Sequence, residues 1–100
     1  MPQGPIAVLQ TPPLYGTATT LYVTGTQVIK ATPGIVCKVN VIVAGAAGGI
    51  YDCATTAAIA TANEIASVPA TAGPLSIEFP CLVGITYKPG SGQVISISYV

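Results

Sequence analysis

The chain has 100 residues and a mass of 10.0 kDa, which is the size of one domain. Only 6% of its residues are charged, and three lysines balance three acidic residues, so the net charge is zero. Because nucleic-acid affinity scales with the number of phosphates that cations neutralise, this composition excludes strong nucleic-acid binding. A surface with so little charge also gives little colloidal repulsion, which favours association with other subunits.

Hydrophobic residues make up 51% of the chain, yet no apolar run has the length of a membrane-spanning helix. The longest run, Val41–Tyr51, is interrupted by glycines and falls well short of the roughly 20 residues that such a helix needs. Met1–Gln10 lacks the basic start and apolar core of a secretory signal. We therefore expect no membrane partner and synthesis in a cytoplasm.

The three cysteines, Cys37, Cys53 and Cys81, are odd in number and show no CxxC spacing. They cannot form a closed disulfide framework, and without histidine they make a poor zinc site. Buried free thiols that act as small hydrophobic side chains are the favoured interpretation. A bridge between Cys53 and Cys81, or one between two chains, remains an alternative.

Residues 1–15 have the composition of an extended arm. Their prolines exclude a helix or a central strand and favour a polyproline-like conformation. The apolar side chains between the prolines need a surface to lie on, either on the same domain or on a neighbour. We therefore divide the chain into an arm (1–15) and one β-sandwich domain (16–100), and we predict that the arm is a main docking element. The candidate contact residues are Pro2, Pro5, Ile6, Val8, Leu9, Pro12, Pro13, Leu14 and Tyr15.

The rest of the chain contains short segments with the alternation and the β-branched residues of strands. Proline and glycine turn signals separate most of them. Asp52–Ala62 mixes alanine with threonine, so we expect a turn there with at most one or two turns of helix. The expected strands are Thr19–Val23, Thr26–Ala31, Ile35–Val43, Ile50–Asp52, Glu64–Val68, Leu75–Phe79, Leu82–Lys88 and Gln93–Val100.

Two hairpins are expected from these segments. The first, Ile35–Tyr51, has a glycine-rich turn at its centre and forms the middle of the domain. The second joins the last two strands through the turn Pro89–Gly92. The side chains expected to face inward are Ile35, Cys37, Val39, Val41 and Val43 in the first hairpin, Ile95, Ile97 and Tyr99 in the second, and Leu75, Ile77 and Phe79 in the strand that Pro80 ends.

About eight short antiparallel strands, with turn signals every 8–12 residues, predict a small all-β domain. The fold class is therefore a β-sandwich or jelly-roll-like domain that follows an extended N-terminal arm. The pattern does not predict the order of the strands.

The sequence contains no arrangement of residues typical of catalysis. Without histidine, Ser–His and Cys–His nucleophile pairs are impossible. The three acidic residues lie on polar sides of strands or at turns, and no helix with a lysine follows Gly45–Gly49 as a phosphate loop requires. We expect a protein that is not an enzyme and that has no cofactor and no metal site.

Three segments of the chain resemble a known group of proteins. They are VIKATPGIVCKVNVIVAGAAGGIYD (28–52), EIASVPATAG (64–73) and LVGITYKPGSGQVISISYV (82–100). In this order they are similar to the small all-β virion proteins of tailed bacteriophages, of the head decoration or cement type. The arm and the cysteines have no counterpart in that pattern.

The resemblance implies a structural subunit on the capsid surface of a virion, made in the host cytoplasm. Its partners would be the major capsid protein and further copies of itself, as a trimer or a dimer. Each copy would bridge neighbouring shell subunits by burying apolar surface. Two other functions remain open: a receptor- or glycan-binding module of a virion fibre or tail that uses the loops Ala44–Gly49 and Pro69–Pro74, and a filament-forming subunit that polymerises through strand edges.

Overall fold

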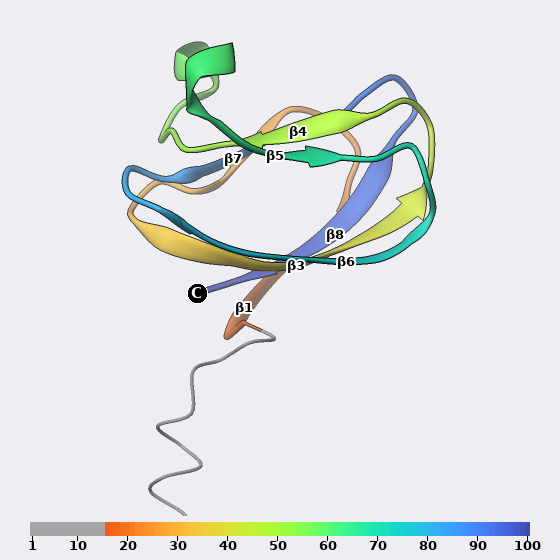
Figure 1. The fold of residues 1–100 in the computed structure, drawn as a ribbon, viewed down its shortest axis with the longest axis horizontal. Helices are drawn as coiled ribbons and strands as arrows, with labels where there is room; N and C mark the ends of the chain where they lie inside the picture. The colour runs from red at the N-terminus through yellow and green to blue at the C-terminus, as the bar shows by residue number, and fades with distance from the viewer. Residues whose placement is uncertain (1–15) are drawn as a thin grey trace, which may run out of the picture.

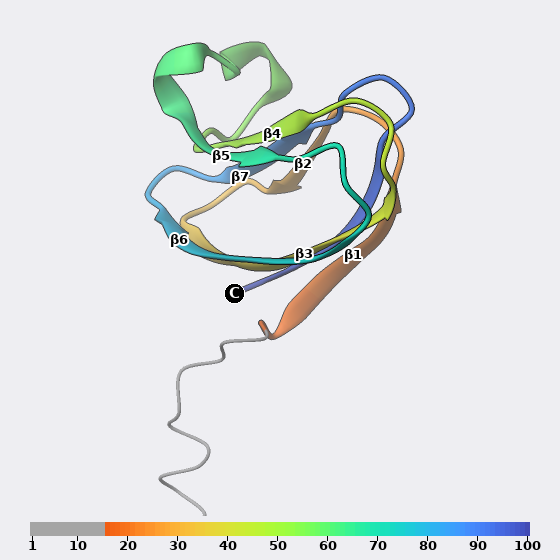
Figure 2. The ribbon, with the colours of Figure 1, turned by 45° about the vertical axis from the view of Figure 1, so that its right-hand side comes forward.

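The computed structural model describes residues 16–100, which form two antiparallel β-sheets packed face to face (Figure 1). Two short 3-10 turns, η1 (Thr56–Ala58) and η2 (Thr61–Asn63), project above one sheet (Figure 2). The strands are β1 (Ala18–Val23), β2 (Gln27–Lys30), β3 (Gly34–Val43), β4 (Gly48–Tyr51), β5 (Glu64–Val68), β6 (Gly73–Cys81), β7 (Ile85–Lys88) and β8 (Val94–Tyr99).

The strand order identifies the sandwich as a jelly roll. Sheet A has the order β1-β8-β3-β6, and sheet B has the order β2-β7-β4-β5. The first strand therefore pairs with the last, the second with the seventh, the third with the sixth and the fourth with the fifth. A long hairpin that is rolled up produces this nested pairing. The predicted all-β sandwich of eight strands is confirmed.

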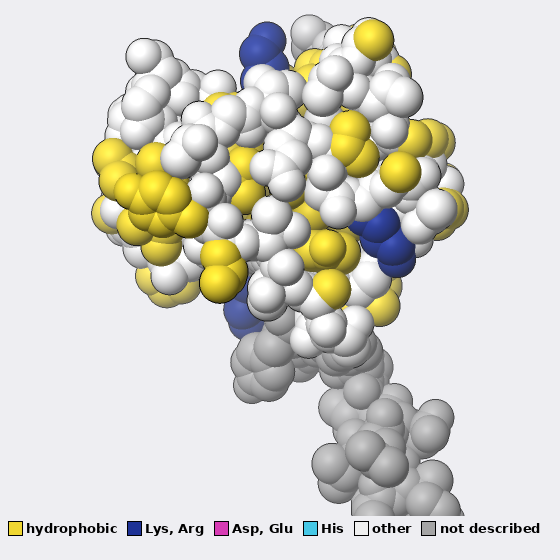
Figure 3. Space-filling view, turned by 180° about the vertical axis from the view of Figure 1, so that it is seen from behind, with side chains coloured by type: hydrophobic (Ala, Val, Ile, Leu, Met, Phe, Trp, Pro, Cys, Tyr) yellow, Lys and Arg dark blue, Asp and Glu magenta, His cyan; other side chains and the backbone are white. Residues whose placement is uncertain are grey.

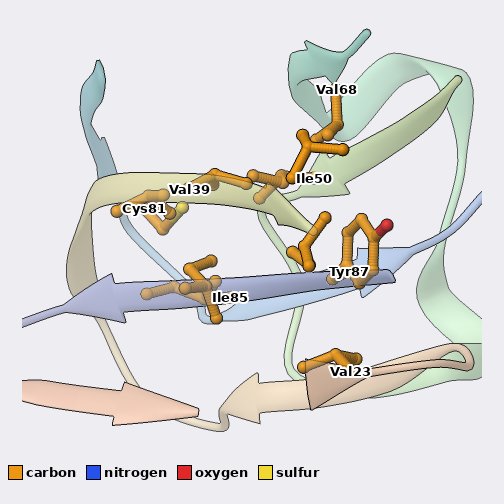
Figure 4. Packing of buried hydrophobic residues seen from close by; sticks show 11 residues of the cluster. Val23, Val39, Ile50, Val68, Cys81, Ile85 and Tyr87 are labelled. Atoms are coloured by element: carbon orange, nitrogen blue, oxygen red, sulfur yellow. The ribbon is translucent and has the colours of Figure 1, made fainter. Parts of the chain in front are cut away.

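The core lies between the two sheets and is built mainly from β-branched side chains. Figure 4 shows Val39 of sheet A facing Ile50 of sheet B, with Val68, Ile85 and Tyr87 around them. All five side chains are completely buried. Because each buried aliphatic side chain contributes about 1.5–3 kcal/mol, this layer holds the two sheets together.

Both predicted hairpins are wrong, because the two strands of each expected hairpin lie in different sheets. β3 pairs with β6 and β8 in sheet A, whereas β4 pairs with β5 and β7 in sheet B. The last two strands, β7 and β8, are likewise in different sheets. The glycines in the two connections have positive φ angles, 50° at Gly45 and 76° at Gly92, and they let the chain leave one sheet for the other instead of reversing within it.

The inward-facing set of β3 is also only partly as predicted. Val39 and Val41 are buried, but Ile35 is 42% exposed and Val36 lies in the core. One extra residue on β3, Cys37, interrupts the register with β8, and the same happens at Ile42. Each bulge shifts the alternation by one residue, so Ile35 and Val43 lie outside the core on either side of a correctly predicted centre.

In β6 a similar irregularity leaves Phe79 exposed, although it was expected to face inward. Ile77 and Glu78 both lie opposite Cys37, and Glu78 has a φ of 52°. Leu75 and Ile77 pack against the core as expected, but Phe79, which follows the bulge on an edge strand, is 46% exposed. Pro80 does not end the strand, since an edge strand has one side on which no ladder hydrogen bond is needed. The C-terminal assignment of Ile95, Ile97 and Tyr99 to the core side is confirmed.

Every edge strand of residues 16–100 carries a bulge. The irregular positions are Leu21–Tyr22 in β1, Ile29 in β2, Ile65 in β5 and Ile77–Glu78 in β6. A bulge twists the edge and misplaces the backbone groups that a further strand would need. The four edges are therefore poor templates for pairing with another chain.

The three cysteines are free thiols, and all three are buried. Cys81 belongs to the core cluster, whereas Cys37 and Cys53 lie outside it. Burial, followed by the nearby Asp52 carboxylate and the Cys53 thiol, raises the pKa of Cys81 to about 11. A buried thiol with so high a pKa is a weak nucleophile at neutral pH, which fits a packing role.

Candidate functional site

The exposed apolar side chains gather at the two ends of sheet A. Among residues 16–100, eight large hydrophobic residues are exposed. Four lie where β3 begins and β6 ends, and we call them the tip group: Ile35, Phe79, Leu82 and Val83. The other four lie where β1 and β3 end, and we call them the far group: Leu21, Tyr22, Ile42 and Val43. In Figure 3, hydrophobic side chains likewise gather toward both sides of the molecule.

A single carboxylate fixes the loop that carries the tip group. Asp52 follows β4 in sheet B, and its side chain accepts backbone hydrogen bonds from Leu82 (3.0 Å), Val83 (2.8 Å) and Gly84 (3.2 Å). Leu82 is 77% exposed and Val83 is 54% exposed. Two large apolar side chains are thus presented to solvent on a loop whose backbone is held in place. A contact surface prepared in this way loses less conformational entropy on binding.

The hydrogen bonds to Asp52 control its ionisation. Partial burial acts to raise the pKa of the Asp52 carboxyl, but the three backbone hydrogen bonds outweigh burial and lower the pKa below its ordinary value of 3.8. A lowered pKa in the folded state means that the ionised form stabilises the fold. This contribution is fully present above the ordinary pKa and is lost as the pH falls through the lowered one.

We expect Asp52→Asn to lower the free energy of unfolding at pH 7 by about 1–2 kcal/mol, because an amide replaces a charged acceptor of three hydrogen bonds. The wild-type protein should also lose stability below about pH 4, and the variant should lack this part of the acid dependence. Urea unfolding of both proteins between neutral pH and acid measures the two effects. Parallel pH profiles for the two proteins would contradict the role assigned to Asp52.

The far group also rests on an ordered backbone. At the bulge in β1, Tyr22 has a φ of 54°, and its N–H donates to Ser96 Oγ at 3.0 Å.

A buried glutamine, Gln93, lies in the connection between β7 and β8 and accepts a hydrogen bond from Tyr87 Oη at 2.6 Å. Gln93 Nε2 donates to the carbonyl oxygens of Val68 (3.3 Å) and Pro69 (3.1 Å). This network ties the connection before β8 to the connection after β5.

The outer face of sheet A carries polar side chains and a groove between its two apolar groups. A groove of about 210 Å³ lies on this face, and the far-group residue Leu21 lines it together with Thr19, Asn40, Pro74 and Ser98. Lys38 Nζ donates to Ser76 Oγ at 2.7 Å across the neighbouring strands. The two apolar groups lie at opposite ends of sheet A, and the far group extends into this groove through Leu21.

The predicted contact residues of the arm, 2–15, lie outside the described residues. The described chain begins at the tip end of sheet A, where Thr17 N donates to Tyr99 O at 2.9 Å. Of the two loops considered for glycan contact, Ala44–Gly49 ends inside β4, which begins at Gly48, and Pro69–Pro74 ends inside β6, which begins at Gly73. No sequence pattern indicates Asp52 as a loop-fixing residue, because its partners are 30 to 32 positions away.

Residues 16–100 contain no group of three or more His, Cys, Asp or Glu side chains that could hold a metal ion. In the same part of the chain, no helix has the length and apolar character needed to cross a membrane. The arrangement offers apolar contact surfaces on a rigid sandwich. Comparisons with protein-family models, with curated proteins and with solved structures found no match to this chain.

Proposed function

We propose that this protein is a structural subunit of a virion that binds the outside of a phage head and bridges neighbouring shell subunits. The observation that carries the proposal is the division of the exposed apolar residues into a tip group and a far group at opposite ends of sheet A. A bridging subunit needs two separate contact surfaces, and this one molecule has two. The resemblance of residues 28–100 to decoration proteins supports the same role.

Bridging by such a subunit would be mechanical. Contact with a neighbour removes apolar area from water, which is worth about 25 cal/mol per Å² before the costs of association. A single copy gains little from a few exposed side chains, but many copies on one lattice add their contacts through multivalency. The zero net charge of the chain removes the repulsion that would oppose close packing of copies, as dimers or trimers, on the shell.

The edges of the sandwich favour this role over a filament that grows by strand addition. Each of the four edge strands has an irregular register next to its neighbour. Association through side chains at the ends of sheet A is compatible with such edges, whereas extension of either sheet by another chain is not.

The arm contributes a further contact in this proposal. The described residues begin at the tip end of sheet A, and the arm precedes them in the sequence. Deletion of residues 2–15 should leave the circular dichroism spectrum of the sandwich unchanged and abolish binding to particles that lack the protein. Cosedimentation with such particles measures binding, and undiminished binding of the shortened chain would remove the arm from the docking surface.

Copy number per particle tests the function as a whole. Quantitative mass spectrometry of purified virions from the native source gives the ratio of this protein to the major shell protein. A fixed, near-stoichiometric ratio supports decoration at the lattice contacts. A handful of copies would instead assign the protein to a tail or fibre, and absence from the particle would overturn the proposal.

A further inference from the structure

The outer face of sheet B contains a hollow over β4. Gly48 and Gly49 have no side chains, and Ile50 beside them turns inward to the core. The register places Gly49 directly between Ser67 of β5 and Lys88 of β7. Tyr51, two residues further along, lies on the same face and is paired with Glu64. The resulting hollow has a volume of about 320 Å³.

The two glycines face opposite sides of sheet B, and Gly49, not Gly48, faces the hollow. A Cβ atom at Gly48 would lie 2.5 Å from Gln93 Oε1 and 2.6 Å from the carbonyl oxygen of Lys88. A Cβ atom at Gly49 would overlap with Glu64 Oε2 and would lie 3.0 Å from Tyr51 Oη. The carboxylate and the phenol therefore both reach over Gly49, and two polar groups converge on one point of the sheet.

The hollow is lined by two charged residues, although the chain has few charged residues. Glu64 and Lys88 are two of the six charged residues in the sequence, and they line the same hollow. The pKa of Tyr51 is raised by burial and by the nearby Glu64 carboxylate, which agrees with their closeness. The walls of the hollow thus offer a negatively charged acceptor, a positively charged donor and two hydroxyl groups.

This mixture of groups selects one class of ligand. An anion would be repelled by Glu64 and a cation by Lys88, whereas a neutral polyol can donate to the carboxylate and accept from the ammonium group. The ring of Tyr51 offers an apolar surface for the C–H face of a sugar. The volume lies at the lower end of the range for small-molecule sites, about 300–1,000 Å³, and suits one or two sugar rings.

We propose that the hollow formed by Gly48, Gly49, Tyr51, Glu64, Ser67 and Lys88 binds a neutral saccharide. The site is independent of the bridging function, because it lies on the outer face of sheet B, whereas the two apolar groups belong to sheet A and the connection that leaves it. A copy whose sheet A contacts are occupied by neighbours keeps this face available for a glycan.

The test is a titration of the full-length, ¹⁵N-labelled protein with glucose, galactose, mannose and N-acetylglucosamine, one at a time, followed by NMR. At least one sugar should shift the amide signals of Gly48, Gly49, Ser67 and Lys88, with a dissociation constant on the order of 1 mM. Glu64→Gln should weaken that binding about tenfold, since a charged acceptor becomes a neutral one. Gly49→Ala, whose added Cβ would displace the Glu64 carboxylate and the Tyr51 phenol, should weaken it as well.

Glu78→Gln is the matched control, because it neutralises an acidic residue on sheet A and should leave the affinity unchanged. The dispersion of the amide spectrum shows that each variant is folded. The proposal is overturned if none of the four sugars shifts these signals at concentrations well above the expected constant. Equal affinities for wild type and Glu64→Gln, or binding of inorganic phosphate at the same residues in place of the sugars, would also overturn it.

Discussion

Replacing Leu82 and Val83 together by serine should reduce the affinity for particles by about 100-fold or more. Burial of a leucine and a valine side chain contributes about 3–6 kcal/mol to a contact, and serine removes most of it. Both side chains are more than half exposed in the free protein, so their replacement should change the stability of the fold little. The measurement is cosedimentation of the purified variant with particles that lack the protein, over a range of protein concentrations.

The matched control for this variant is Ala57→Ser with Ala58→Ser, on two exposed residues of η1. It also replaces two neighbouring apolar residues by serine, and it should bind like the wild type. Both variants should unfold at the wild-type temperature. If the Leu82 and Val83 variant is folded and binds particles as tightly as the control does, the tip group is not a docking surface.

The largest effect on stability is expected for Gln93→Leu. The side chain of Gln93 is 1% exposed, and leucine fills its volume without offering any hydrogen bond. The variant leaves the hydroxyl of Tyr87 and the carbonyl oxygens of Val68 and Pro69 buried or partly buried without this partner. We expect the free energy of unfolding to fall by about 2–4 kcal/mol, measured by urea denaturation.

Two further variants separate the hydrogen bonds from the change of side chain. Tyr87→Phe removes only the hydroxyl that donates to Gln93 and should cost about 1–2 kcal/mol. Gln27→Leu makes the same substitution at an exposed position of β2 and should change stability by less than about 0.5 kcal/mol. Equal stabilities of Gln93→Leu and Gln27→Leu would show that the network does not stabilise the fold.

The sequence was sufficient to locate the strands but not to pair them. Alternation and turn residues are local properties, and they placed segments such as Glu64–Val68 at the observed bounds. Pairing depends on whether a connection reverses within a sheet or crosses to the other one. The glycine-rich connection after β3 permits either path. The packing of one face of each sheet against the other decides between them, so the expected hairpin of Ile35–Tyr51 was wrong.

Bulges explain most of the errors in the predicted inward-facing residues. In β3 the alternation is correct at Val39 and Val41 and fails at Ile35 and Val43, on the far sides of the bulges at Cys37 and Ile42. A bulge is defined by how two strands that are distant in sequence pair with each other, so the sequence of either strand alone does not reveal its position. The exposed apolar groups arise partly from these shifts, which is why they could not be predicted from the sequence.

Only some of the candidate surfaces could be predicted from the sequence. The apolar composition of the arm is visible in the sequence, and its docking role stays a prediction. The role of Asp52 was not visible, because a carboxylate at a turn is ordinarily solvated and its three donors belong to a loop far along the chain. The hollow over Gly49 likewise depends on three strands that meet only in the folded sheet.

The nested pairing of the strands sets the order in which this chain can fold. β4 and β5 are joined by the connection 52–63, and each further pair encloses the previous one until β1 meets β8. The entropic cost of closing the loop is smallest for the innermost pair of strands. Each pair that forms brings the two strands of the next pair closer together. Folding should therefore begin in the middle of the sequence, advance outward and be slow for a chain of this size. Since β8 lies between β1 and β3, sheet A cannot be completed on the ribosome until the last strand has been synthesised.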